Sequence, residues 1–204
     1  MEAIFIILIL LFSVVIHEVS HGYAALALGD QTAKDEGRLS LNPIVHLDPI
    51  GSFLVPLVGF LSGGIIIGWA KPVPFNPYNL RNQRWGEALV AVAGPLSNIM
   101  IAVVFSIIIK LAESAGFATE PFLFAASYLV YINIILALFN LIPIPPLDGS
   151  KILFSVLPYK FQSFRLALER YGIILVLIFI FFLWRLLAPL ASDILSLLID
   201  TPLL

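Results

Sequence analysis

The sequence predicts an all-α polytopic membrane protein, with about four spanning helices, a re-entrant apolar segment and short β-strands near a polar site. Of the 204 residues, 60% are hydrophobic and 12% are charged, and the mean hydropathy is +1.04. Soluble proteins carry about twice that share of charge. Several apolar runs reach the roughly 20 residues that a helix needs to cross a bilayer. Clustered prolines and glycines between these runs predict irregular backbone beside the helices.

Composition also excludes several classes of function. The net charge of −2 gives no reason to expect nucleic-acid binding. The chain has no cysteine, which excludes disulfides, thiolate zinc sites and cysteine nucleophiles. Any bound metal must then be held by His, Asp or Glu. The N-terminus has neither a basic region nor a small-residue cleavage site, so we expect no removable signal peptide.

The first predicted helix, residues 3–28, carries three ionisable side chains at membrane depth. His17 and His21 are spaced i and i+4, so both rings project from one helix face and can share a metal ion. Glu18 can reach a metal-bound water, and His-Glu-x-x-His is typical of zinc hydrolases. Two satisfied histidines beside a snorkelling glutamate are the weaker interpretation, because an ionisable residue at this depth costs about 2.5–3.5 kcal/mol.

Turns and prolines break the chain between the first and second predicted helices. Residues 38–42 alternate as a short strand would, and residues 68–77 are too rich in proline for a helix and are expected to be extended. Residues 52–68 are apolar but carry Pro56 and several glycines. We expect this segment to be re-entrant, without crossing the membrane.

Three further spans are predicted, at residues 86–111, 122–142 and 171–190. We divide the chain into a membrane-embedded core, residues 1–157, and a C-terminal part, residues 158–204. The C-terminal part comprises an amphipathic linker, the last transmembrane helix and a tail.

A catalytic zinc usually takes three protein ligands, and the residues alone leave the third ligand open. The candidates are Asp148, His46, Asp48 and Glu87. Prolines at positions 143, 145 and 146 prevent a regular helix before Asp148, and irregular backbone at membrane depth must be buried in protein or line a wet cavity. A role for Asp148 as the N-cap of a following helix is equally compatible with this pattern. His46 follows a turn and fits a loop position better than a metal site.

Three motifs occur in a fixed order along the chain. They are His17–Gly22, Ala93-Gly94-Pro95-Leu96-Ser97-Asn98, and Asn140-Leu141-Ile142-Pro143-Ile144-Pro145-Pro146-Leu147-Asp148-Gly149. Together they resemble the motifs of the site-2 protease family of intramembrane zinc metalloproteases. The resemblance covers roughly residues 4–155. The chain departs from larger members because it has no PDZ domain between the second and third predicted spans, and no CBS domain after the last one.

The resemblance implies a function and a set of site residues. His17, His21 and Asp148 would bind one zinc ion per chain, Glu18 would be the general base, and Asn140 would hold the substrate or the developing oxyanion. The protein would be a metalloendopeptidase that cleaves transmembrane segments of membrane proteins, as in regulated intramembrane proteolysis. Its partners would be a transmembrane protein substrate and the lipid bilayer, and we expect it in the cell membrane of a prokaryote.

Two other classes of protein would use the same residues. An inactive relative would bind transmembrane segments without cutting them, but it would not need Glu18. A metal transporter would need several polar binding sites at different depths in the bilayer, whereas the ionisable residues here gather around one site.

The shared metal site also constrains the topology. His17 and Asp148 both lie near the exit ends of predicted spans, so these two ends must lie on the same membrane face. An odd number of crossings between them would separate the two residues, and the interrupted segment 52–68 is the one expected not to cross. The distribution of Lys and Arg favours the same topology, with the site toward the cytoplasmic face.

Overall fold

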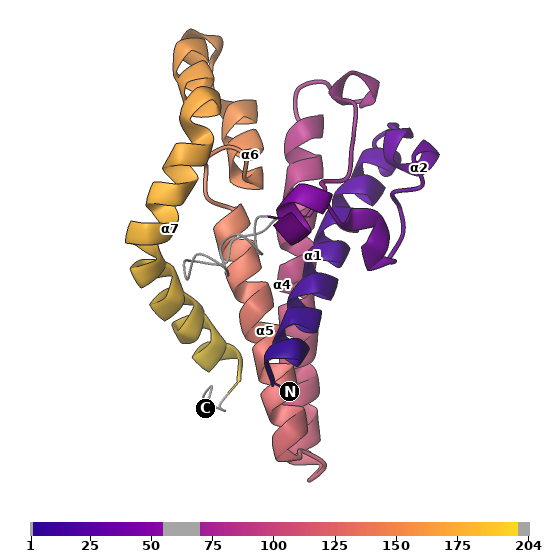
Figure 1. Ribbon diagram of the computed structural model, residues 1–204, viewed down its shortest axis with the longest axis vertical. Coiled ribbons are helices and arrows are strands. Elements are labelled where there is room, and N and C mark those ends of the chain that lie inside the picture. Colours follow the sequence, from indigo (N-terminus) through magenta and orange to yellow (C-terminus); the bar gives the residue numbers. More distant parts are fainter. Residues whose placement is uncertain (1, 55–69, 200–204) are drawn as a thin grey trace.

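The computed structural model describes residues 2–54 and 70–199, and these residues are helical or irregular (Figure 1). The long helices are α1 (Glu2–Ala27), α4 (Gly86–Ser114), α5 (Glu120–Asn140) and α7 (Gln162–Leu198), and the shorter elements are α2 (Thr32–Asp35), η1 (Pro43–His46), η2 (Pro49–Leu54), η3 (Pro77–Asn79), α6 (Asp148–Val156) and η4 (Tyr159–Phe161). Most of the predicted segment 52–68 lies outside the described residues.

Three of these helices are long and apolar enough to cross a membrane, namely α1, α4 and α5. Helix α7 is a fourth candidate if its two parts, which meet at a bend of 67°, form one span. The prediction of about four spans agrees with this count only when α7 is included. The chain between α4 and α5, residues 115–119, is too short to hold an inserted domain.

Helices α1 and α4 run antiparallel, and α5 runs back in the direction of α1 (Figure 1). The hydrogen bonds agree with this arrangement. Ser13 and His17 of α1 contact Asn98 of α4, whereas His21, further along α1, contacts Val90 earlier in α4. The end of α1 and the start of α4 therefore lie at the same end of the bundle, as the shared metal site requires.

Small residues allow the helices to pack closely. Ala102 of α4, Ala126 of α5 and Ala191 of α7 are all buried in one apolar cluster. Close approach at small residues stabilises helix pairs in membranes, where the hydrophobic effect between helices is weak. The same cluster contains larger buried side chains, among them Ile109 and Val130. Helices α4, α5 and α7 thus share one core.

The predicted short β-strands near the polar site are wrong, because no strand occurs in residues 2–54 or 70–199. Residues 38–41 and 70–75 are irregular, and single side chains bond their backbone groups. The guanidinium of Arg38 donates to the carbonyl oxygens of Lys71 and Pro72, at 2.8 and 3.2 Å, and to that of Val45. Proline, which lacks an N–H group, also occurs twice in residues 70–75, so few N–H groups remain for a ladder of backbone bonds.

Asp30 anchors the irregular segment to the end of α1. Its buried carboxylate accepts hydrogen bonds from Thr32 Oγ1 at 2.6 Å, from the Asn76 N–H at 2.8 Å and from Asn79 Nδ2 at 2.8 Å. Burial acts to raise the pKa of this carboxyl, but the hydrogen bonds outweigh burial and lower the pKa below its ordinary value. The anchor directs residues 70–76 back along α1.

We expect Asp30→Ala to lower the free energy of unfolding by about 1–3 kcal/mol at pH 7, because it removes the acceptor of several buried hydrogen bonds. Since the native pKa is lowered, this stabilisation is present above the ordinary carboxyl pKa of about 3.9 and is lost as the pH falls through the native value. Thermal unfolding in detergent micelles at pH 7 and about pH 3 measures both effects. The exposed Glu36→Ala is the control, and equal effects of the two substitutions would contradict the anchor.

Candidate metal centre

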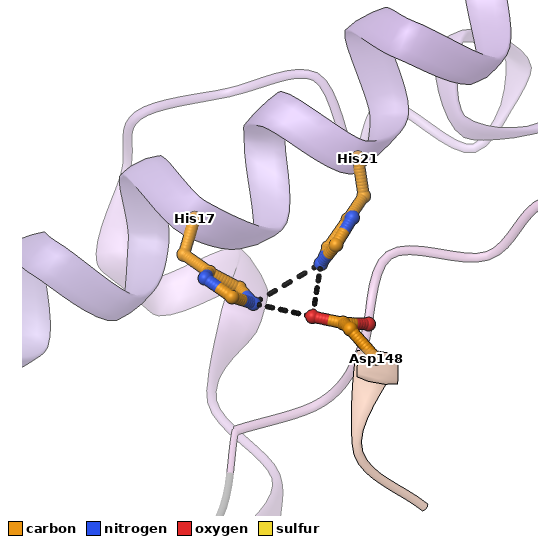
Figure 2. A group of neighbouring side chains, drawn as sticks. All are labelled: His17, His21 and Asp148. Atoms are coloured by element: carbon orange, nitrogen blue, oxygen red, sulfur yellow. Dashed lines mark hydrogen bonds and ion pairs between the residues drawn. The ribbon is translucent and has the colours of Figure 1, made fainter. Parts of the chain in front are cut away.

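Three side chains from distant parts of the chain converge in the bundle (Figure 2). His17 and His21 come from α1, and Asp148 is the first residue of α6. His17 Nε2, His21 Nε2 and Asp148 Oδ2 lie 3.1 Å from one another in all three pairs. All three residues are buried, and they form the only group of three or more His, Cys, Asp or Glu residues suited to a metal within the described part of the chain.

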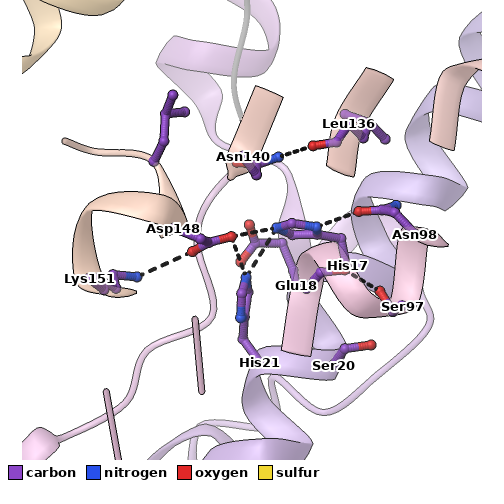
Figure 3. Close-up of polar contacts among 12 residues, drawn as sticks. His17, Glu18, Ser20, His21, Ser97, Asn98, Leu136, Asn140, Asp148 and Lys151 are labelled. Atoms are coloured by element: carbon purple, nitrogen blue, oxygen red, sulfur yellow. Dashed lines mark hydrogen bonds and ion pairs between the residues drawn. The ribbon is translucent and has the colours of Figure 1, made fainter. Parts of the chain in front are cut away.

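The far side of each imidazole ring is held by a hydrogen-bond acceptor. His17 Nδ1 lies 2.6 Å from Asn98 Oδ1, and His21 Nδ1 lies 2.7 Å from the carbonyl oxygen of Val90. An acceptor at Nδ1 holds the hydrogen there, so Nε2 of each neutral ring presents a lone pair to the centre. Figure 3 shows Asn98 behind His17, on the side away from Asp148.

Electron-rich atoms at this spacing are well placed to share a cation. Burial acts to raise the pKa of the Asp148 carboxyl, but the contacts with His17 and His21, together with the charge of Lys151, hold that pKa well below its usual range. The carboxylate is thus ionised at neutral pH, and it faces two imidazole nitrogens. Four ligands at about 2.0–2.1 Å from a tetrahedral zinc lie roughly 3.3 Å apart, close to the observed spacing. The donor set and its dimensions therefore fit zinc with one position left open.

Gly94 of α4 packs directly against both imidazole rings. A Cβ atom added at this position would lie 2.4 Å from His21 Nε2 and 2.6 Å from His17 Nε2. Glycine here is required by the close approach of α4 to α1, since any side chain would displace the rings.

A second glycine brings Asp148 into place. The added Cβ of Gly149 would lie 2.2 Å from the carbonyl oxygen of Leu141, so α6 folds back tightly on the loop that precedes it. Lys151, one turn along α6, lies 3.6 Å from Asp148 Oδ1. The other carboxylate oxygen, Oδ2, is left to face the histidines. The N-cap of α6 is Leu147, so Asp148 is the first residue of the helix and not its cap.

Glu18 lies beside this centre, half-buried on α1 (Figure 3). Its Oε2 atom accepts a hydrogen bond of 2.9 Å from the backbone N–H of Val73. The irregular segment 70–76 therefore runs next to the metal centre and holds one carboxylate oxygen of Glu18.

Comparisons with known proteins identify relatives that cover most of the chain. "Putative zinc metalloprotease YwhC" of Bacillus subtilis is 37% identical over 180 residues, which cover 85% of this chain and 78% of YwhC. The Peptidase family M50 domain matches residues 108–183. This chain belongs to peptidase family M50, the site-2 protease family.

Other M50 relatives are more distant. "Putative zinc metalloprotease Rip2" of Mycolicibacterium smegmatis is 26% identical over 82% of this chain and 63% of its own length. "Zinc metalloprotease MJ0392" of Methanocaldococcus jannaschii is 29% identical over 76% of this chain, but only 35% of its own length is matched. No solved structure matches the chain. Membership of M50, together with three apolar helices, identifies an integral membrane protein.

The structure brings together some of the candidate residues and separates others. His46, Asp48 and Glu87 are not part of the metal group. His46 is buried, and its Nε2 lies 2.7 Å from the carbonyl oxygen of Ser40, so it is a structural histidine of the loop. Asn140 donates from Nδ2 to the Leu136 carbonyl one turn back in α5, at 3.0 Å.

Sequence reasoning missed the residues that support the ligands. The contacts of Gly94 with the rings, and of Asn98 with His17, were not foreseen, although both residues belong to a motif of the resemblance. A glycine-proline pair inside an apolar span was the available signal, because it is unfavourable in a helix without a packing reason.

We expect Gly94→Ala in this M50 peptidase to abolish stoichiometric zinc binding, because the new methyl group would overlap the position of both rings. Metal analysis of purified protein measures this loss. Gly116→Ala is the matched control. It lies in the connector after α4, where an added Cβ meets nothing within 4 Å. Its positive φ of 73° makes alanine cost about 1 kcal/mol, but the metal should remain. Full zinc content in Gly94→Ala would contradict the packing argument.

Proposed function

We propose that this M50 peptidase is a zinc-dependent endopeptidase that cleaves transmembrane segments of membrane proteins. One observation carries the proposal: three ligand atoms converge inside an apolar helical bundle, with a carboxylate next to them that is not a ligand. His17, His21 and Asp148 would hold the metal, and Glu18 would act on water. The names of the relatives support a metalloprotease, and their bacterial and archaeal origin supports a prokaryotic cell membrane.

The metal supplies chemistry that the side chains lack. When bound, zinc lowers the pKa of water to about 7 and polarises a carbonyl group. The protein fixes the ligands before the metal arrives, since Asn98 and Val90 hold the two rings and Lys151 holds the carboxylate. Ligands fixed in this way cost little reorganisation on binding.

Glu18 is suited to the role of general base. One of its oxygens is occupied by the Val73 N–H, which orients the carboxylate, and the group is only half-buried. The remaining lone pairs would take the proton of the attacking water and return it to the leaving amine. Asn140, at the end of α5, would donate from its amide to the substrate or to the developing oxyanion.

The location of the site supports a substrate within the membrane. All three metal ligands are at least nine-tenths buried, on or beside helices that are apolar enough to span. A metal transporter would need further polar binding sites across the bilayer, whereas the described residues contain a single group of side chains suited to a metal.

Zinc content and cleavage together test the proposal. Glu18→Gln should keep about one zinc per chain and lose roughly 10²- to 10⁴-fold in cleavage of a co-expressed single-span protein, because an amide cannot accept the proton. Asp148→Ala should lose both the zinc and the activity. Cleavage by Glu18→Gln at the wild-type rate would refute the role of the base, and full zinc content in Asp148→Ala would remove that ligand.

Asn140→Ala should lower turnover by about 10²-fold or more while leaving the zinc content unchanged, because the proposed contact is with the substrate rather than the metal. Single-turnover cleavage and metal analysis on the same preparation separate the two effects. Loss of zinc along with activity would instead make Asn140 a structural residue of α5.

A further inference from the structure

A single peptide group lies between a buried arginine and Glu18. The Nη2 atom of Arg38 donates to the carbonyl oxygen of Pro72 at 3.2 Å, and the N–H of the next residue, Val73, donates to Glu18 Oε2 at 2.9 Å. The carbonyl of Pro72 and the N–H of Val73 belong to the same trans peptide bond. Because this group is planar and its C=O and N–H point in opposite directions, fixing one end also fixes the other.

The two charged side chains match the two ends of this peptide group. A guanidinium is always protonated and can only donate hydrogen bonds, whereas an ionised carboxylate can only accept them. Arg38 therefore faces the negative, oxygen end of the peptide dipole, and Glu18 faces the positive, N–H end. Hydrogen bonds that follow one another in this way polarise and strengthen each other away from water.

The surroundings of Arg38 direct its charge to the backbone. Only 6% of its surface is exposed, and it forms no ion pair with a carboxylate among the residues that the structure describes. Its guanidinium donates instead to the carbonyl oxygens of Val45, Lys71 and Pro72. The rigid fork of an arginine can hold several acceptors in one geometry, which a flexible ammonium cannot do as well.

Two other contacts hold this region without touching the peptide group itself. The side chain of Val73 packs on α1, where a Cβ added at Gly22 would lie 2.9 Å from Val73 Cγ1. Asp30 binds the N–H of Asn76, three residues further along. Both contacts leave the peptide group able to rotate, and rotation would turn its carbonyl oxygen toward the carboxylate of Glu18. The guanidinium opposes that rotation because it holds the carbonyl oxygen on the other side.

We propose that Arg38 is a positioning residue for the general base Glu18 and acts through the Pro72–Val73 peptide group. The hydrogen bond from Val73 is the only one that Glu18 makes within the described residues, so this peptide group sets the direction of the carboxylate. One oxygen is then engaged and the other is left for water. The inference rests on the proposed function for the role of Glu18, but the hydrogen bond is a property of the protein without metal or substrate.

NMR of one labelled peptide group tests the proposal in metal-free protein. Residues 72 and 73 are the only Pro-Val pair in the sequence, so proline labelled with carbon-13 at the carbonyl and valine labelled with nitrogen-15 select this group alone. In wild type, in micelles at neutral pH, the Val73 amide proton should resonate downfield and exchange slowly with solvent. Glu18→Ala removes the acceptor and should shift that proton upfield. Arg38→Gln keeps the acceptor but should shift both the proton and the Pro72 carbonyl carbon upfield.

Cleavage kinetics give a second readout. Arg38→Gln should lower kcat by about 10- to 100-fold with KM and zinc content unchanged, because a base that is misplaced by a fraction of its length loses about this much. In a Glu18→Gln protein, the same Arg38 substitution should cause no further loss, since the two residues act through one contact. A substitution that only loosened the fold would lower the rate in both backgrounds.

Two further arginine variants sharpen the comparison. Arg81→Gln removes the same charge from an exposed position, so the Val73 amide and the turnover should both stay as in wild type. Arg38→Lys keeps the charge and a donor but lacks the fork, and it should restore part of the downfield shift and part of the turnover that Arg38→Gln loses.

Three results would overturn the proposal. The first is a wild-type Val73 amide without a downfield shift, which decides the question even if no variant accumulates. The second is an Arg38→Gln protein whose Val73 amide is the same as in wild type. The third is a full additional loss of turnover when Arg38→Gln is combined with Glu18→Gln. A protein that has the expected amide shifts but does not cleave transmembrane segments would support the positioning contact and contradict the proposed function.

Discussion

Three electron-rich atoms held 3.1 Å apart inside an apolar bundle are the constraint on which the rest of this structure depends. Lone pairs at this distance repel one another unless a hydrogen or a metal cation lies between them, and the surrounding residues hold the three side chains in place. Val90 and Asn98 fix the rings, Gly94 lets α4 approach them, and Gly149 lets α6 fold back to deliver Asp148. The role of each of these residues therefore follows from its contact with the centre and not from the stability of the helix in which it lies.

The part of the site that depends on local geometry could be predicted from the sequence. His17 and His21 share a helix face because of their spacing alone, and Glu18 follows from the same motif. Asp148 lies 131 positions from His17, and the residues alone could not choose between a ligand and a helix cap. Only the family resemblance made that choice before the structure was known. Asn98 Nδ2 contacts Asn133 of α5 and the carbonyl oxygen of Ser13 of α1, and no local pattern reveals these contacts.

The fold was predictable where hydrophobicity decides it. Long apolar runs became α1, α4 and α5 with boundaries within a few residues of those expected. The prediction of β-strands was wrong. A proline-rich stretch is compatible with extended backbone, but the pattern does not indicate which groups will form hydrogen bonds with that backbone. Here individual side chains form hydrogen bonds with single backbone groups of this stretch, namely those of Arg38, Asp30 and Glu18. Such long-range bonds from side chains leave no periodic signal in the sequence.

The contact of Gly94 with both histidine rings has a mechanical consequence. Both rings pack against a position with no room for even one methyl group, so α1 cannot slide along α4 by a helical turn, about 5.4 Å, without collision. Movement of α1 against α4 is therefore restricted at the two histidine ligands. A change in the shape of this centre would then come from the other elements around it, such as α6, which carries Asp148.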